Sequence, residues 1–313
     1  MKIIMDVDTG IDDALALSYA CGLKEVELIG VMTSFGNVTI DTAVRNTINV
    51  LDLFDNTIPV YRGASHPLEN EFIMKDIAYR IHGNNGIGDV ELGEPKRKEE
   101  ELNATDFLLE SCNKYGKELT LVAVGPLTNL ALAISKDKET VSKIGKIVIM
   151  GGALTIPGNV SKYAEANIHS DPLAAKIVFE SGIPCVVVGL DVTLKTFITD
   201  NDIEIWNKHS KASDALYGMT SYYYRNKFDG IRKGGALHDP LALDIAVFPD
   251  TCTNYFPINL SAITEGEAKG KIVGSLERLN DKNKSALACL DINSEVFLNR
   301  FVSTINNLLE RTN

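Results

Sequence analysis

Four aspartates fall within eight residues near the start of the chain, in the segment Asp6-Val7-Asp8-Thr9-Gly10-Ile11-Asp12-Asp13. The apolar pattern predicts a strand at residues 2–7 and a helix at residues 12–21, so these acids lie where the first strand gives way to the first helix. Because residues two apart on a strand face the same side, we expect Asp6 and Asp8 to project together from its carboxyl end. Ligands bind at that edge in open α/β sheets.

The close spacing of these acids has an electrostatic cost. Two carboxylates about 5 Å apart repel by roughly 3 kcal/mol at an effective dielectric of 20, whereas a helix N-terminus stabilises a nearby anion by about 0.3–1 kcal/mol. Either some of the aspartates are protonated or a cation lies among them, and oxygen ligands favour calcium or magnesium over zinc. A plainer interpretation is also open, in which Asp12 caps the helix, Asp6 binds backbone amides and the others are solvated.

The surrounding elements that must position this segment follow an α/β pattern. Short β-branched runs alternate with amphipathic segments, which predicts a single domain over residues 1–313 with a mostly parallel central sheet and helices on both faces. After residue 190 we expect an extra helical stretch at 200–248, an antiparallel β-hairpin made by 254–264 and 268–273, and a last helix at 294–309. The expected strands are 2–7, 26–33, 57–60, 119–124, 146–150 and 184–188, and the other expected helices are 40–54, 105–112, 127–134 and 172–180.

Composition excludes several classes of partner. The chain has 31 Lys and Arg against 42 Asp and Glu, a net charge of −11, so we expect no nucleic acid partner. No apolar run approaches the roughly 18 residues that span a bilayer, so we expect no membrane partner. The five cysteines are scattered and never spaced as CxxC, which argues against a disulfide framework or a zinc site and favours the reducing cytoplasm.

The opening DVDTGIDDALAL resembles the DxDPGxDD opening of the nucleoside hydrolases, the inosine-uridine preferring group. Thr9 departs from that pattern, since many members have proline there, which loosens the turn without removing a ligand. Each further block is weak alone, but the ordered set is specific and covers nearly the whole chain. Those blocks are GNVT at 36–39, HGNNGIG at 82–88, VGPLTNLALA at 124–133, MGGA at 150–153, GNVSKYAEANIHSDPLAA at 158–175 and HDPLAL at 238–243.

This resemblance implies hydrolysis of the N-glycosidic bond of a ribonucleoside to ribose and a free base, with a bound Ca²⁺ ion. It implies that Asp8 takes a proton from the attacking water and also binds the ion. The other implied ion ligands are Asp13, Asp239 and the backbone carbonyl of Val124. The resemblance also implies that His238 protonates the leaving base, a role that suits an imidazole.

The same resemblance implies a set of substrate contacts and a homodimer or homotetramer. Asp12 would accept a hydrogen bond from a ribose hydroxyl, and His82 would line the base pocket. The remaining implied ribose contacts are Asn37, Met150, Asn159, Glu165 and Asn167. Base preference is not fixed by the sequence, because the stretch 221–235, with Tyr222, Tyr223 and Tyr224, lies where the family varies.

Local interpretations compete with some of these roles. Asp239-Pro240 and Asp171-Pro172 both have the pattern of a helix N-cap followed by proline at the first helical position, and only the resemblance singles out Asp239. Asn37 and Asn159 each follow glycine, which is typical of turns. Two other functions also stay open, a magnesium-dependent acid-loop phosphatase and a non-catalytic nucleoside- or ribose-binding protein.

Overall fold

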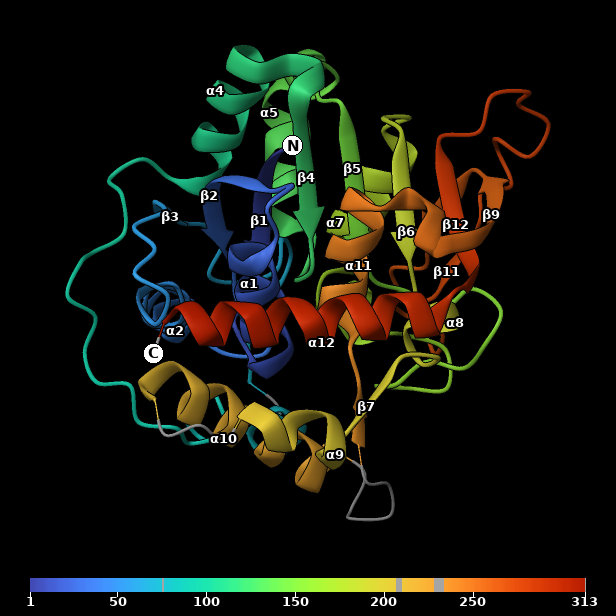
Figure 1. The fold of residues 1–313 in the computed structure, drawn as a ribbon. Coiled ribbons are helices and arrows are strands. Elements are labelled where there is room, and N and C mark those ends of the chain that lie inside the picture. The colour runs from blue at the N-terminus through green and yellow to red at the C-terminus, as the bar shows by residue number, and fades with distance from the viewer. Residues whose placement is uncertain (75, 207–209, 228–233, 313) are drawn as a thin grey trace.

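The computed structural model describes residues 1–74, 76–206, 210–227 and 234–312, and its centre is an eight-stranded sheet (Figure 1). The strand order is β3-β2-β1-β4-β5-β6-β12-β9, and neighbouring strands run parallel except β9, which is antiparallel to β12. The predicted α/β fold with a mostly parallel sheet is therefore confirmed. The strands are β1 (Lys2–Val7), β2 (Glu27–Thr33), β3 (Val60–Arg62), β4 (Leu119–Ala123), β5 (Lys146–Met150), β6 (Cys185–Val188), β9 (Cys252–Ile258) and β12 (Ala286–Ile292).

Helices cover both faces of the sheet, and this explains why its inner strands are apolar without alternation. Met5 and Val7 of β1 face one apolar cluster, while Ile4 between them faces the other. The first cluster contains α1 (Ile11–Gly22), α2 (Ile40–Asp52), α11 (His238–Val247) and α12 (Ser294–Arg311). The second contains α4 (Ala104–Tyr115), α5 (Thr128–Val141) and α7 (Pro172–Glu180).

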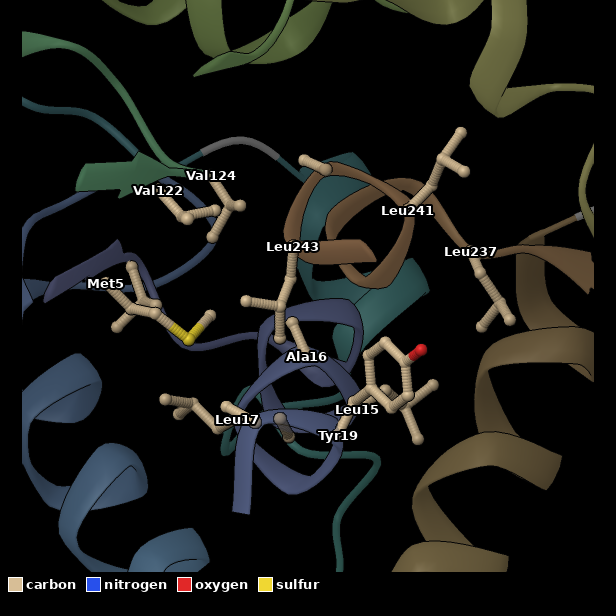
Figure 2. Packing of buried hydrophobic residues seen from close by; sticks show 14 of the residues in the cluster. Met5, Leu15, Ala16, Leu17, Tyr19, Val122, Val124, Leu237, Leu241 and Leu243 are labelled. Carbon is tan, nitrogen blue, oxygen red and sulfur yellow. The ribbon is translucent and has the colours of Figure 1, made fainter. Parts of the chain in front are cut away.

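Helices α1 and α11 pack closely against each other, although they are more than 200 residues apart in the sequence. Figure 2 shows Leu243 of α11 beside Ala16 of α1, with Met5 of β1 nearby. All of these side chains are fully buried. This packing fixes the N-termini of both helices at the same end of the sheet, and α12 lies across them (Figure 1).

The region after residue 190 differs in part from the prediction. The predicted helical stretch 200–248 contains α9 (Asp200–Ile203), α10 (Lys211–Lys227) and α11, but also β8 (Gly234–Ala236), which pairs with β7 (Phe197–Thr199). The predicted hairpin forms only between β10 (Leu260–Ala262) and β11 (Ile272–Gly274). Residues 254–258 instead belong to β9 and pair with β12, a strand that was not predicted.

Smaller elements complete the fold. They are α3 (Asp76–His82), α6 (Ala166–Ser170), α8 (Leu190–Thr193) and the short 3₁₀ turns Gly116–Glu118, Glu204–Trp206 and Pro249–Thr251. Within the described ranges, none of the helices is both long and apolar enough to cross a bilayer.

The sheet has a topological switch point between β1 and β4. The chain proceeds from β1 outward to β2 and β3 on one side, and from β4 to β5 and β6 on the other. The crevice outside the carboxyl ends of two such strands is where ligands bind in open α/β sheets. The two strand ends are tied together there, because Val124 N donates to the carbonyl of Asp6 at 2.8 Å.

Candidate active site

The loop between β1 and α1 is folded around the carboxylate of Asp13. Asp8 N donates to Asp13 Oδ1 and Gly10 N donates to Asp13 Oδ2, each at 3.0 Å. This arrangement closes the turn and buries both carboxylates, with Asp8 1% exposed and Asp13 fully buried. Asp13 therefore binds the backbone as well as contributing charge, and the simple solvated interpretation of these acids is wrong.

Asn37 joins the two carboxylates from the loop after β2. Its backbone N donates to Asp8 Oδ2 at 2.5 Å, and its Nδ2 donates to Asp8 Oδ1 at 3.2 Å and to Asp13 Oδ2 at 3.1 Å. The residue before it must be glycine, because a Cβ on Gly36 (φ 153°) would lie 2.0 Å from Asp8 Oδ2. The Gly36-Asn37 turn thus brings a polar side chain directly against the acidic loop.

Asp12 connects the acidic loop to the start of α11. Its Oδ2 accepts hydrogen bonds from the backbone N of His238 at 3.0 Å and of Asp239 at 3.1 Å. Helix α11 begins at His238, so Asp239 lies in the first turn and is not the N-cap. Asp171, in contrast, does cap α7 by accepting from Ala174 N at 3.0 Å. The N-cap interpretation therefore holds for Asp171 and is wrong for Asp239.

A third group of site residues lies at the ends of β4 and β5. Asn167 Nδ2 donates to the carbonyl of Val124 at 2.7 Å and to the carbonyl and Sδ of Met150 at 3.2 and 3.3 Å. Glu165 caps α6, since its carboxylate accepts from the backbone N of Asn167, Ile168 and Gly152. Burial raises the pKa of Glu165, and these amide bonds oppose the shift.

These segments enclose one cavity of about 300 Å³, a size suited to a small ligand. Every site residue predicted from the sequence lines it except Asp13, which lies against Asp8. The lining residues that were predicted are Asp8, Asp12, Asn37, His82, Val124, Met150, Asn159, Glu165, Asn167, His238 and Asp239. Asn159 also keeps its turn role, because its Oδ1 accepts from Ala166 N at 3.0 Å.

The sequence did not predict the apolar and aromatic wall of this cavity. Of the three consecutive tyrosines at 222–224, Tyr223 lines the cavity, and its ring centroid lies 5.8 Å from that of His82. His82 Nδ1 accepts from Ile11 N at 3.1 Å, which places the proton of the neutral ring on Nε2. Residues 228–233 of the flagged stretch lie outside the described residues. Other lining residues that were not predicted are Phe72, Ile73, Ile77, Arg80 and Ile81.

The buried acids perturb one another. The pKa of Asp8 is raised well above its ordinary value, first by burial and then by the charge of Asp13. Burial also raises the pKa of Asp13, and it raises the pKa of Asp6 to about 7. Within the part of the chain that the structure describes, no Lys or Arg forms an ion pair with Asp8 or Asp13. A cation among these acids would relieve that repulsion.

The carboxylates of Asp8, Asp13 and Asp239 and the carbonyl of Val124 offer only oxygen atoms, the ligands that calcium and magnesium prefer. Among the described residues, however, no three acidic, histidine or cysteine side chains are already grouped as metal ligands. The amide of Asn37 occupies oxygens of Asp8 and Asp13, and the amide of Asn167 occupies the carbonyl of Val124. The donor chemistry therefore fits such an ion, provided that these two amides move aside.

Comparison with known proteins decides the family. The profile of the inosine-uridine preferring nucleoside hydrolases matches residues 3–299. The chain belongs to this family. A solved structure, a purine-preferring ribonucleoside hydrolase from Gardnerella vaginalis, is 43% identical and superimposes with a TM-score of 0.96 over 99% of this chain and 100% of that one.

Curated relatives lead to the same reaction. Uridine nucleosidase 1 of Arabidopsis thaliana is 42% identical over 256 residues, which is 80% of this chain and 75% of the relative. The pyrimidine-specific ribonucleoside hydrolase RihA of Photobacterium profundum is 35% identical over 97% of this chain and 98% of the relative. As a nucleoside hydrolase, the protein hydrolyses ribonucleosides to the base and ribose, which confirms the resemblance seen in the sequence. These relatives carry both purine and pyrimidine names at similar identity, so they do not decide base preference.

Proposed function

We propose that this nucleoside hydrolase uses Asp8 as the base that takes a proton from the attacking water. The observation that supports this most is the position of Asp8: it lines the cavity at the switch point and is held there from two sides by Asn37. A carboxylate at this position can accept a proton from a water molecule bound in the cavity.

We also propose a calcium ion as the cofactor, held by Asp8, Asp13, Asp239 and the carbonyl of Val124. The support is the oxygen-only donor set and the near-complete burial of the three carboxylates, which are 1%, 0% and 4% exposed. When bound, Ca²⁺ would supply contacts to the ribose diol and lower the pKa of the attacking water.

The chain's own side chains account for binding of the sugar. Asp12, Asn37, Asn159, Glu165 and Asn167 bring acids and amides to the wall of the cavity, and such groups suit a polyol. Met150 also lines the cavity, beside Asn167 at the end of β5. Holding the sugar rigidly matters because cleavage passes through an oxocarbenium-like ribosyl cation. These residues therefore supply orientation as well as affinity.

The base would lie against His82, His238 and Tyr223, which line the same cavity. His238 is proposed to protonate the leaving base, and His82 to line the base pocket together with Tyr223. When the C–N bond breaks, its electron pair goes to the base nitrogen, and this nitrogen receives a proton from His238. Water adds to the sugar carbon and loses a proton to Asp8.

We further propose a cytoplasmic homodimer or homotetramer whose partner is a small ribonucleoside and not a nucleic acid. The net charge of −11 supports the absence of a nucleic acid partner. All five cysteines are free thiols, four of them buried, which supports a reducing compartment. The oligomeric state rests on the family resemblance.

An HPLC screen of common nucleosides, run on chelated protein with and without added Ca²⁺, tests the proposal. We expect free base and ribose only with Ca²⁺, and a loss of about 10²–10⁴ in turnover for Asp8→Asn, with the fold retained by circular dichroism. Tight nucleoside binding without product would favour the non-catalytic binding protein. Hydrolysis of p-nitrophenyl phosphate in preference to p-nitrophenyl riboside would favour the phosphatase.

A further inference from the structure

A buried hydroxyl, that of Thr193, contacts the ring of His238 and has no role in the reaction proposed above. Thr193 is the last residue of α8, which follows the carboxyl end of β6, and its side chain is fully buried. Its Oγ1 lies 2.7 Å from His238 Nδ1. Thr193 is not among the described residues that line the cavity, whereas His238 is. The ring is thus held from the side away from the substrate.

We propose that Thr193 is the positioning residue for His238, holding the imidazole so that Nε2 serves the leaving base. This inference rests on the proposed function. A hydroxyl both donates and accepts hydrogen bonds, so Thr193 keeps its bond to Nδ1 whether or not Nδ1 carries a proton. A proton can therefore pass through Nε2 without turning the ring.

Thr193 is itself rigidly placed. Its backbone N donates to the carbonyl of Gly189 at 3.1 Å, and its carbonyl accepts from Thr196 Oγ1 at 2.7 Å. The β-branched side chain is also stiff about its first torsion. At the other end, the backbone N of His238 is fixed on Asp12 Oδ2 at 3.0 Å. Backbone and ring of His238 are therefore held by two independent contacts from distant segments.

The chemistry of the leaving group separates this role from a merely structural one. In a nucleoside, the glycosidic electron pair goes to a base nitrogen that must be protonated, so an aligned acid lowers the barrier. In p-nitrophenyl riboside, the C–O bond breaks to give p-nitrophenolate, which leaves as a stable anion without a proton. Loss of the Thr193 hydroxyl should therefore matter for the first substrate and little for the second.

The test compares Thr193→Val, Thr193→Ser and His238→Ala with wild type on a nucleoside and on p-nitrophenyl riboside. Thr220→Val is the matched control, since Thr220 is equally buried and its hydroxyl also makes a 2.7 Å bond, to the carbonyl of Leu216. For Thr193→Val we expect kcat on the nucleoside to fall by about 10–100-fold, part of the full contribution of an acid. We expect its KM, and its activity on p-nitrophenyl riboside, to stay within about threefold.

The other three variants separate the loss of the hydroxyl from a general effect on the fold. Thr193→Ser should restore nucleoside turnover to within about threefold of wild type, because it returns the hydroxyl, and Thr220→Val should match wild type. Equal losses on both substrates in Thr193→Val would overturn the proposal, as would unchanged nucleoside turnover alongside a large loss in His238→Ala. If Thr193→Val does not fold, Thr193→Ala takes its place.

If the proposed function is wrong, the wild-type protein itself will release no base from any nucleoside. That result is distinct from any effect of the Thr193 variants. Crystal structures decide the positioning role in that event: a His238 ring that turns in Thr193→Val but not in Thr220→Val supports it, and an unmoved ring overturns it.

Discussion

Chelation of divalent cations should lower the thermal stability of this protein, because a bound cation offsets the repulsion between buried acids. Asn37 Nδ2 contacts carboxylate oxygens of both Asp8 and Asp13, at 3.2 and 3.1 Å, so the two groups are close neighbours. At about 5 Å, such a pair repels by roughly 3 kcal/mol at an effective dielectric of 20. A cation that binds only the folded state at 100 times its Kd adds about 2.7 kcal/mol.

That free energy converts to a measurable shift in the unfolding midpoint. With about 2.1 cal/mol/K of unfolding entropy per residue, 313 residues give about 0.7 kcal/mol/K, so 2.7 kcal/mol corresponds to about 4 °C. Scanning fluorimetry of chelated protein across a CaCl₂ series measures it. Asp13→Asn should lose the shift, whereas Asp214→Asn, at an exposed position on α10, should keep it. A wild-type shift below about 1 °C, or an equal shift in Asp13→Asn, would show that no cation binds at Asp8 and Asp13.

Three further predictions concern the core, pH and the sugar. Arg300→Met should lower the free energy of unfolding by about 3–5 kcal/mol in urea, because fully buried Asp244 loses the cation 2.8 Å away; a loss below about 1 kcal/mol would count against this. The pKa of Asp6 is about 7 in the fold, so its neutral form stabilises the protein at low pH and this stability is lost as pH rises through 7. Asp6→Asn, still able to accept from Asn129, should therefore gain about 2.6 kcal/mol over wild type between pH 5 and pH 8 in EDTA, and parallel urea-stability profiles would contradict it. Because Asp12 is proposed to bind a ribose hydroxyl, 2′-deoxyribonucleosides should show kcat/KM at least about tenfold lower than ribonucleosides, and equal values would remove that contact.

The local pattern predicted one part of the site, the acidic loop, whereas the other site residues, from Asn37 to Asp239, were predicted only through the family resemblance. Asp8, Asp12 and Asp13 stand at a strand-to-helix junction, and the alternation of strands and helices predicted that this junction lies at the binding edge of a parallel sheet. The pattern did not predict which contact each acid makes. Asp13 accepts a hydrogen bond from the loop backbone, and Asp12 accepts one from the first residue of α11. Both contacts depend on how the loop folds.

Other features depend on contacts between distant segments, which local patterns do not encode. The strand β12 contains Ala286 and Ala288, residues of low strand propensity, and it forms because it pairs with β6 and β9. Asp171 and Asp239 share the same local sequence pattern, yet of the two only Asp171 caps a helix. At the start of α11 the backbone N of Asp239 instead donates to the carboxylate of Asp12. The contact of Thr193 with His238 joins residues 45 apart, and its only sequence signal is the position of Thr193 just after a strand.

The calcium site can be observed in a crystal structure of the protein grown with millimolar CaCl₂ and ribose. We predict one calcium ion within about 2.3–2.6 Å of carboxylate oxygens of Asp8, Asp13 and Asp239 and of the carbonyl of Val124, with the sugar diol bound to it. We also predict that the amides of Asn37 and Asn167 leave their present acceptors. Water in place of the ion, with these amides still on Asp8 and Val124, would show that these residues do not form a calcium site.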